Sequence, residues 1–313
     1  MTALITGADG FLGSTLMKRN SNFLGIDLTR KNKKVDICDL RDKKAFHRYL
    51  QDHHVTEIIH LAGVQYNTYI QRKNRLDFFR QNIEFAESIK HESVLLGIRK
   101  VVYVSTDMVY GDRIKSPISE EFTPNPLGEY GASKLNAEKI LLENNDSFKL
   151  VILRPRLILG KGRVGTIQKL ARLINSPFPI IIIGNGKNRY QFVDISDVCS
   201  AIELSLMSNI SGIFNIGSDN PPNLDAVFKF TLEALGKKKY LLKVPMKLSI
   251  FVFNILDYMG LSPLAPEQYK IAGLDFFLET SKIKNSLGWI PTKSDETMLF
   301  ESLSVLMKPD SQD

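Results

Sequence analysis

The sequence predicts an α/β fold built around a parallel β-sheet with helices on both faces. Short β-branched runs alternate with longer segments whose apolar residues recur at helical spacing, which is typical of strands joined by crossover helices. The strand-like runs are almost continuously apolar, as expected when both faces of a sheet are covered. With 313 residues, 43% of them hydrophobic, the chain is long enough to bury one large core or two smaller ones.

The predicted elements follow one another in a regular order. We expect strands at 2–6, 23–27, 57–62, 100–106 and 149–155, and helices at 11–19, 40–53, 75–97 and 131–145. Beyond residue 155, Gly and Pro become more frequent between helical segments, which indicates a smaller C-terminal lobe. The predicted division assigns residues 1–155, with a return near 190–218, to the doubly wound domain, and residues 156–189 and 219–313 to the smaller lobe.

The composition limits the classes of function that the chain can have. The formal net charge of +7 favours phosphate-bearing ligands, but the densest cluster, Lys237–Lys239, lacks the interleaved aromatic residues typical of nucleic-acid binding. Cys38 and Cys199 fit no disulfide framework, so we expect two buried thiols and a reducing, cytoplasmic environment. Segment 1–10 lacks the features of a secretory signal, and the five histidines lack the paired spacing of zinc ligands. We therefore expect no nucleic-acid partner and no metal.

The most apolar segment of the chain lies at residues 246–261. It contains Asp257 and is shorter than the roughly 20 apolar residues that span a bilayer, so we expect no integral membrane segment. We interpret it as a buried or cleft-lining helix. Contact with a membrane surface is the alternative interpretation.

Three glycines follow the first predicted strand and open the first predicted helix. Gly7, Gly10 and Gly13 have the spacing GxxGxxG, which permits a tight turn and lets a pyrophosphate approach the backbone N–H groups. The second strand ends in Asp27, where a carboxylate can bind the adenosine ribose hydroxyls. This combination of strand, loop, helix and acid predicts a dinucleotide-binding site.

Asp27 also bears on which dinucleotide is bound. A carboxylate at this position repels a 2′-phosphate, so NAD is favoured over NADP. Arg30 is the opposing feature, because a guanidinium folded over the ribose would accept NADP. Asp36 and Ile37 are candidate adenine contacts; the alternative is a strand end followed by a helix that Asp39 caps.

A second group of residues points to proton transfer. Ser105 and Thr106 follow a predicted buried strand, and open α/β sheets bind their ligands at such carboxyl ends. Tyr130 and Lys134 are four residues apart, so on a helix they share one face. A tyrosine has a pKa near 10, and Lys134 together with a positively charged nicotinamide ring would lower that pKa enough for the phenol to act as a base.

Taken together, these motifs resemble the extended short-chain dehydrogenase/reductases of the NAD-dependent epimerase/dehydratase type. The similarity covers nearly the whole chain, in TGADGFLG (6–13), HLAG (60–63), STDMVYG (105–111), YGASK (130–134), LRP (153–155) and TSKIKNSLGWIP (280–291). It implies a Rossmann domain with a smaller C-terminal substrate-binding lobe, a nucleotide-sugar substrate and a homodimer formed through a four-helix bundle. It also implies catalytic residues at Thr106, Tyr130 and Lys134. From the residues and the resemblance together, the expected cofactor contacts are Gly7, Asp9, Gly10, Phe11, Leu12, Gly13, Asp27, Asp36, Ile37, Leu61, Ala62, Gly63, Asn82, Ser105, Tyr130, Lys134 and Pro155.

The resemblance implies a mechanism with two main outcomes. Tyr130 removes a hydroxyl proton as hydride passes from a sugar carbon to NAD, and Thr106 holds the resulting ketone. Return of the hydride to the opposite face gives an epimerase, whereas release of the ketone gives a dehydrogenase. Dehydratases of this family usually carry a glutamate at the position of Met108, which cannot transfer a proton, so dehydration is disfavoured.

The substrate is less well defined by the sequence. Many nucleotide-sugar enzymes of the family have an asparagine where this chain has Leu157, and Arg189 lies one residue earlier than their usual arginine. We expect substrate contacts at Thr106, Asp107, Met108, Arg163 and Arg189. The alternatives are a 3β-hydroxysteroid-type or other alcohol dehydrogenase, suggested by the apolar segment at 246–261, and a non-catalytic NAD-sensing protein, for which an intact Thr-Tyr-Lys set is unnecessary.

Overall fold

The central feature of the fold is a parallel sheet of seven strands in the order β10-β6-β5-β4-β1-β2-β3. The computed structural model describes residues 2–65, 74–112, 115–163 and 165–307. The sheet strands are β1 (Ala3–Thr6), β2 (Leu24–Asp27), β3 (Val35–Ile37), β4 (Glu57–His60), β5 (Lys100–Val104), β6 (Lys149–Pro155) and β10 (Gly212–Ile216). The order reverses direction between β1 and β4, which is the topological switch point of a Rossmann fold. The predicted α/β class is confirmed.

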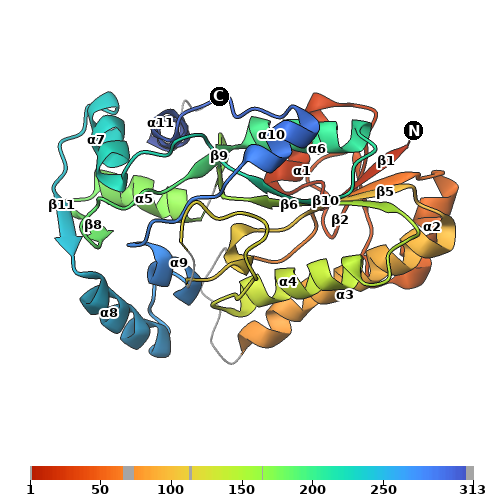
Figure 1. Ribbon diagram of the computed structural model, residues 1–313, viewed down its shortest axis with the longest axis horizontal. Helices are drawn as coiled ribbons and strands as arrows, with labels where there is room; N and C mark the ends of the chain where they lie inside the picture. Colours follow the sequence, from red (N-terminus) through yellow and green to blue (C-terminus); the bar gives the residue numbers. More distant parts are fainter. Residues whose placement is uncertain (1, 66–73, 113–114, 164, 308–313) are drawn as a thin grey trace.

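Helices cover both faces of this sheet (Figure 1). The first seven helices are α1 (Phe11–Arg19), α2 (Lys43–Asp52), α3 (Arg75–Leu96), α4 (Glu129–Leu142), α5 (Thr166–Asn175), α6 (Ile195–Met207) and α7 (Leu224–Ala234). The remaining helices are α8 (Met246–Tyr258), α9 (Pro266–Ile271), α10 (Ser281–Leu287) and α11 (Asp295–Met307). Within the described residues, no helix has both the length and the apolar character needed to span a bilayer.

The apolar core explains why the strands are apolar throughout. Ile5 packs with α1 and α6 on one face of the sheet, whereas its neighbour Leu4 packs with α2, α3 and α4 on the other. Both side chains are fully buried. Because successive side chains of a strand point to opposite faces, a sheet covered on both sides needs apolar residues at every position.

The C-terminal part of the chain returns to the sheet before it forms further helices. Strand β10 pairs with β6, and α6 packs on the same face as α1. Two smaller parallel sheets lie beyond, one of β7 (Leu157–Leu159) and β9 (Phe192–Asp194), the other of β8 (Ile180–Ile183) and β11 (Leu241–Val244). A separate apolar cluster joins α5, α7 and α11. In Figure 1 these elements, with α8, lie at the end of the molecule opposite α2.

Several element boundaries and the orientation of one helix differ from the sequence predictions. Strand β4 ends at His60, because Leu61 and Ala62 instead donate their N–H groups to Thr6 beside the glycine loop. The predicted cap at Asp39 is wrong, since Asp42 accepts the Ala45 N–H at the start of α2. The interpretation of 246–261 as a buried helix is also wrong: α8 forms, but most of its apolar side chains point outwards.

Candidate active site

The glycine loop packs against the segment that follows β4. Gly7 has a φ of +72°, and a Cβ added there would lie 2.8 Å from the Ala62 nitrogen. A Cβ at Gly13 would lie 2.3 Å from the Gly7 carbonyl oxygen, because α1 begins directly against the turn. Both positions therefore require glycine, and the turn leaves the first backbone amides of α1 free of bulky neighbours.

Asp27 holds the loop by its carboxylate. It accepts hydrogen bonds from the Asp9 N–H at 3.0 Å and the Leu28 N–H at 2.7 Å. The Asp9 carboxylate in turn accepts the N–H groups of Lys31 and Asn32. These contacts fix the loop after β1 relative to the end of β2, which is the arrangement that a dinucleotide-binding acid requires.

Arg30 is engaged at the edge strand of the sheet. Its guanidinium donates to the Val35 carbonyl oxygen at 2.8 Å and to an Asp36 oxygen at 2.8 Å. The Tyr49 hydroxyl donates to the other Asp36 oxygen at 3.1 Å. Ile37, the next residue of β3, is 65% exposed and presents an apolar surface at the same edge. The pairing with Asp36 favours a structural role for Arg30 over a role in binding a 2′-phosphate.

The segment Leu61–Gly63 connects the glycine loop with the middle of α4. A Cβ added at Gly63 would lie 3.1 Å from Asn82 Oδ1 and 3.8 Å from Lys134 Nζ. Asn82, on α3, accepts the Val64 N–H and donates to the Val64 carbonyl, and it also donates to the Ser133 hydroxyl. Asn82 thus joins α3, α4 and this segment, and the predicted cofactor and catalytic elements meet here.

The carboxyl end of β5 carries the next predicted residues. Thr106 donates its hydroxyl to Asp107 Oδ1 at 3.1 Å and accepts the Met108 N–H at 3.3 Å, so it caps the short 3₁₀ helix Asp107–Val109. The Ser105 hydroxyl is buried and has no hydrogen-bond partner within the described part of the chain. A buried polar group of this kind costs free energy unless a ligand or water satisfies it.

Asp107 forms a buried ion pair that the sequence analysis did not identify. Arg156 Nη1 lies 2.6 Å from Asp107 Oδ2, and both side chains are almost fully buried. The Arg156 guanidinium lies 4.2 Å from the centre of the Tyr190 ring and 4.7 Å from that of Phe276. Asp107 is therefore held in place beside Thr106 by a residue directly after Pro155, where only a strand end was predicted.

Lys134 is buried near the carboxyl end of β5. Its Nζ donates to the Val104 carbonyl oxygen at 2.8 Å and lies 4.3 Å from the centre of the Tyr103 ring. Burial lowers the pKa of the Lys134 ammonium to about 7. His60 stacks on the same Tyr103 ring and bonds to the Thr6 hydroxyl, and burial lowers its pKa to about 3, so it is neutral.

Tyr130, at the start of α4, is partly buried and lies beside Thr106, Asp107 and Arg163. Burial is the largest effect on the pKa of Tyr130 and raises it above its ordinary value; the nearby Glu267 and Asp107 raise it further. The Arg163 guanidinium and a hydrogen bond with the Thr106 side chain lower it. The sequence analysis expected Lys134 to lower this pKa, whereas in this structure Arg163 and Thr106 are the groups that do so.

The two arginines predicted as substrate contacts lie in different surroundings. Arg163 lies 5.3 Å from the centre of the Phe11 ring and acts electrostatically on Tyr130, so it joins the glycine loop to the catalytic residues. Arg189 instead donates to the Pro221 carbonyl oxygen and lies 4.3 Å from the centre of the Phe277 ring. Of the other predicted contacts, Leu12 and Pro155 are buried, and Gly10 caps α1 in an extended conformation.

Glu267 is a further site residue that the sequence analysis missed. Its carboxylate accepts the N–H groups of Tyr130 at 3.1 Å and Gly131 at 3.3 Å, in the first turn of α4. The side chain is only 2% exposed, and burial raises its pKa to about 7. It belongs to α9, more than a hundred residues along the chain, so no local motif could indicate the contact.

The comparisons with known proteins agree with this geometry. The model of the NAD dependent epimerase/dehydratase family matches residues 3–217, more than half of the chain. The chain belongs to this family. NAD, which the glycine loop predicted, is the cofactor that gives the family its name. The protein y4nG of Sinorhizobium fredii is 30% identical over 96% of this chain and 77% of its own length.

One more relative and one solved structure show the range of this family. The dTDP-D-glucose 4,6-dehydratase of Dictyostelium discoideum is 30% identical over 72% of this chain and 60% of that protein. The crystal structure of UDP-glucose 4-epimerase from Thermotoga maritima, with UDP-glucose, superimposes with a TM-score of 0.79 at 22% identity, covering 98% of this chain and 99% of that one. At this identity the structural match establishes the fold, which agrees with the Rossmann sheet described above.

The residues present fit a bound NAD. The Gly7 and Gly13 turn leaves the start of α1 open, Asp27 stands at the end of β2, and the Ser105 hydroxyl is buried without a partner in the described chain. These three features surround the switch point between β1 and β4, where Rossmann folds bind dinucleotides.

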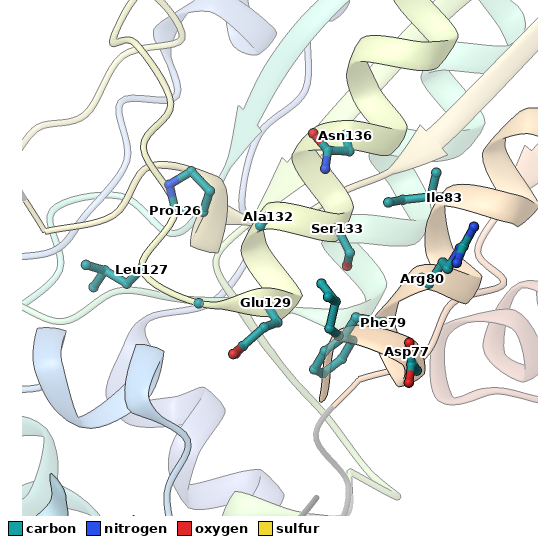
Figure 2. A pocket seen from close by; sticks show the side chains of 12 residues that line it. Asp77, Phe79, Arg80, Ile83, Pro126, Leu127, Glu129, Ala132, Ser133 and Asn136 are labelled. Carbon is teal, nitrogen blue, oxygen red and sulfur yellow. The ribbon is translucent and has the colours of Figure 1, made fainter. Parts of the chain in front are cut away.

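A separate pocket lies between α3 and α4 (Figure 2). It has a volume of about 550 Å³ and is lined on one side by Phe79 and Ile83 and on the other by Ala132, Ser133 and Asn136. None of the glycine-loop residues lines it. It therefore lies between two helices of the face that α2, α3 and α4 cover, away from the glycine loop.

Proposed function

We propose that the protein is a nucleotide-sugar epimerase that works through a transient keto intermediate, with Tyr130 as the general base. The observation that carries this proposal is the grouping of Tyr130, Thr106 and Arg163, in which the Thr106 side chain and the Arg163 guanidinium both act on the Tyr130 phenol. Bound NAD supplies the hydride acceptor and donor. Tyr130 takes the proton of the sugar hydroxyl, and the Thr106 hydroxyl bonds to the same oxygen as it becomes a ketone.

Lys134 and Arg163 have separate roles in this proposal. Arg163 stabilises the phenolate of Tyr130, since it already lowers the pKa of that phenol. Lys134, fixed by the Val104 carbonyl and close to Gly63, is placed to bind a polar group of the dinucleotide. Its lowered pKa makes it responsive to an anionic neighbour, which would restore its charge.

The residue at position 108 favours epimerisation over dehydration. The chain is similar in sequence to a 4,6-dehydratase and similar in fold to a 4-epimerase. At Met108 the chain has a thioether, which cannot act as an acid or base on the neighbouring carbon. The neighbouring Asp107 is committed to Arg156. An epimerase needs neither group, because it returns hydride to the same carbon.

Three further parts of the proposal concern the domains, the choice of dinucleotide and the oligomeric state. Residues 1–155, with the return near 190–218, would hold the dinucleotide, and residues 156–189 and 219–313 the substrate. NAD is favoured over NADP, because Asp27 lies at the ribose position and Arg30 is paired with Asp36. A homodimer through α3 and α4 is supported by their exposed apolar residues, which include Leu76, Leu95 and Leu142.

The experiment that tests this function uses a panel of nucleotide sugars. The purified protein would be incubated with NAD and UDP-, GDP-, CDP- or dTDP-sugars, and with hydroxysteroids as the competing class. Absorbance at the reduced-nicotinamide band reports net oxidation, and NMR reports the configuration of each sugar carbon. We expect inversion of one carbon without accumulation of NADH. Net NADH formation with a hydroxysteroid would instead identify an alcohol dehydrogenase.

The outward orientation of α8 bears on that competing class. The hydroxysteroid alternative depended on an apolar segment at 246–261 that lines a cleft. In the structure Leu248, Phe251 and Ile255 of this segment are exposed. That support for a steroid substrate is therefore lost, and the exposed face points to a different role.

A further inference from the structure

Helix α8 exposes a broad apolar side. Apolar side chains recur there at helical spacing, and Lys247 and Asn254 are exposed beside them. The exposed apolar side chains are Leu248, Phe251, Val252, Ile255 and, at the end of the helix, Tyr258 and Met259. The buried residues of the helix are Ser249 and Asp257. A surface helix normally buries its apolar side and exposes its polar side. Contiguous exposed apolar patches of this kind mark sites of contact with another surface.

Contacts of the inward side hold α8 in this orientation. Asp257 pairs with Arg75 at the start of α3, and both side chains are buried. The Phe253 ring stacks on Tyr269 of α9 with their centres 5.2 Å apart, and the Tyr269 hydroxyl donates to Asn254 at 2.8 Å. Turning the apolar side inwards would break this buried ion pair, which is costly. The exposed apolar side is therefore a fixed feature of the fold.

The segment that contains this side is rich in lysine. Between Gly236 and Pro263 the chain carries five lysines and a single acid, the buried Asp257. Lys237, Lys238 and Lys247 are exposed. Lys243 is also exposed and forms an ion pair with Asp225. An apolar strip bordered by lysines is typical of helices that lie in the headgroup region of an anionic membrane.

The strand before α8 extends the apolar surface. Leu242 of β11 is paired in register with Ile181 of β8, and both are exposed on this two-stranded sheet. Tyr240, which precedes β11, is 72% exposed. Aromatic residues with a polar end are favoured where water meets lipid. Because Pro245 alone separates β11 from α8, the strand and the helix form one continuous border of the molecule, at the left of Figure 1.

We propose that α8, with the β8–β11 edge, binds the surface of a membrane that contains anionic lipids. The apolar side chains would enter the headgroup region, and the lysines would meet the lipid phosphates. A second copy of this chain fits the surface less well, because a symmetric contact would bring the same lysines of the two copies together. The inference concerns α8 and its neighbours alone and does not depend on which sugar the active site accepts.

Vesicle flotation tests this proposal. The full chain would be mixed with vesicles of equal parts phosphatidylglycerol and phosphatidylcholine, or with vesicles of phosphatidylcholine alone. We expect binding to the anionic vesicles, weaker binding to the neutral ones, and loss of binding as salt shortens the range of the lysine charges. Absence of binding to the anionic vesicles would overturn the proposal.

Variants separate the apolar contribution from the charges. In Phe251→Gln with Ile255→Gln we expect the partition to anionic vesicles to fall roughly tenfold or more. In Lys237→Gln with Lys238→Gln we expect a fall of roughly 25-fold, about fivefold for each lysine. Met207→Gln, at an exposed apolar residue on α6, is the matched control and should bind as the unaltered chain does.

Two further measurements separate membrane binding from misfolding and from self-association. Thermal unfolding of each variant should match that of the unaltered chain, because the altered side chains are exposed. Sedimentation velocity compares the oligomeric state of the variants. If Phe251→Gln with Ile255→Gln dissociates an oligomer and leaves vesicle binding unchanged, the surface belongs to a second copy of the chain and the proposal is wrong.

Discussion

The glycine loop and helix α8 differ in what determines their role. In the loop, backbone atoms approach so closely that a Cβ at Gly13 would lie 2.3 Å from a carbonyl oxygen. In α8 and its last turn, six apolar side chains are exposed on one side while Ser249 and Asp257 are buried on the other. The glycines of the loop can be recognised from their spacing in the sequence, although the loop also packs against Ala62. The orientation of α8 is set by residues far away in the sequence, such as Arg75 and Tyr269.

This difference separates changes that stop chemistry from changes that unfold the chain. Thr106 and Tyr130 lie at the carboxyl end of the central sheet, where open α/β folds bind their ligands. The inward side of α8 is a packing contact. Substitutions at the two places should therefore affect different measurements.

The largest effect is expected at Tyr130. Replacing it with Phe removes the hydroxyl that accepts the substrate proton, so turnover should fall by about 10²–10⁴-fold. NAD binding and the midpoint of thermal unfolding should change little, because the ring stays in place. Turnover is measured with the nucleotide sugar identified by the panel, and NAD binding by calorimetry.

Tyr240→Phe is the matched control for this change, since Tyr240 is 72% exposed. It should have the turnover of the unaltered chain. If Tyr130→Phe also retains full turnover, Tyr130 is not the base. Full cellular function of Tyr130→Phe would favour the NAD-sensing alternative.

Asp257→Ala, on the inward side of α8, should mainly lower the unfolding free energy of the chain. It leaves the buried Arg75 without its carboxylate partner, and breaking a buried ion pair in this way typically costs about 3–5 kcal/mol of unfolding free energy. Phe251→Ala, on the exposed side of the same helix, should cost about 0.5 kcal/mol or less. Urea unfolding of the two variants, monitored by circular dichroism, compares them directly. Equal losses would mean that α8 does not pack as described.

The active-site motifs and the orientation of α8 were not equally predictable from the sequence. The strand and helix order and the glycine turn follow from local patterns, because each pattern fixes its own geometry. The grouping of Tyr130 with Thr106 was implied by the family resemblance. The orientation of α8 and the contacts of Glu267 depend on pairings between distant segments, which periodicity does not encode. The sequence correctly indicated that 246–261 is strongly apolar. The direction in which those residues point depends on the ion pair between Asp257 and the distant Arg75.

Arg156 illustrates the same limit within the active site. The sequence analysis considered Leu157 and Arg189 as departures from the nucleotide-sugar pattern, and passed over the residue between Pro155 and Leu157. Its ion pair with Asp107 joins the end of β6 to the end of β5. Adjacent parallel strands bring these two residues together, so the strand order, once known, supplies the contact.

A smaller effect is expected at the glycine loop. In Gly13→Ala the new methyl group would overlap the Gly7 carbonyl and the Ala8 backbone, so the turn must shift, at a cost of about 1–3 kcal/mol. At Gly10 a Cβ would lie 3.1 Å from the Gly7 oxygen, so Gly10→Ala should destabilise less. Thermal unfolding without NAD compares the two variants. A loss at Gly10→Ala as large as that at Gly13→Ala would contradict the packing described for the loop.

The smallest effect is expected at Glu267 of α9, which contacts the first turn of α4 at Tyr130. Burial raises the pKa of Glu267 to about 7, with Glu129 raising it and Arg75 lowering it as further influences. The folded chain then binds a proton that the unfolded chain has already released between about pH 4.5 and pH 7, so this group lowers stability as pH rises across that interval. Glu267→Gln should remove this slope, whereas Glu87→Gln, at an exposed position on α3, should retain it.

The same variant has a second readout in catalysis. The negative charge of Glu267 raises the pKa of Tyr130, so its removal should lower that pKa and move the acidic limb of the kcat/KM profile to lower pH. One hydrogen bond to the first turn of α4 is lost at the same time, because the glutamine amide cannot accept the Gly131 N–H through its nitrogen. A purely structural contact would lower activity equally at all pH values. A limb that moves in Glu267→Gln and stays fixed in Glu87→Gln would therefore show that α9 tunes the catalytic phenol electrostatically.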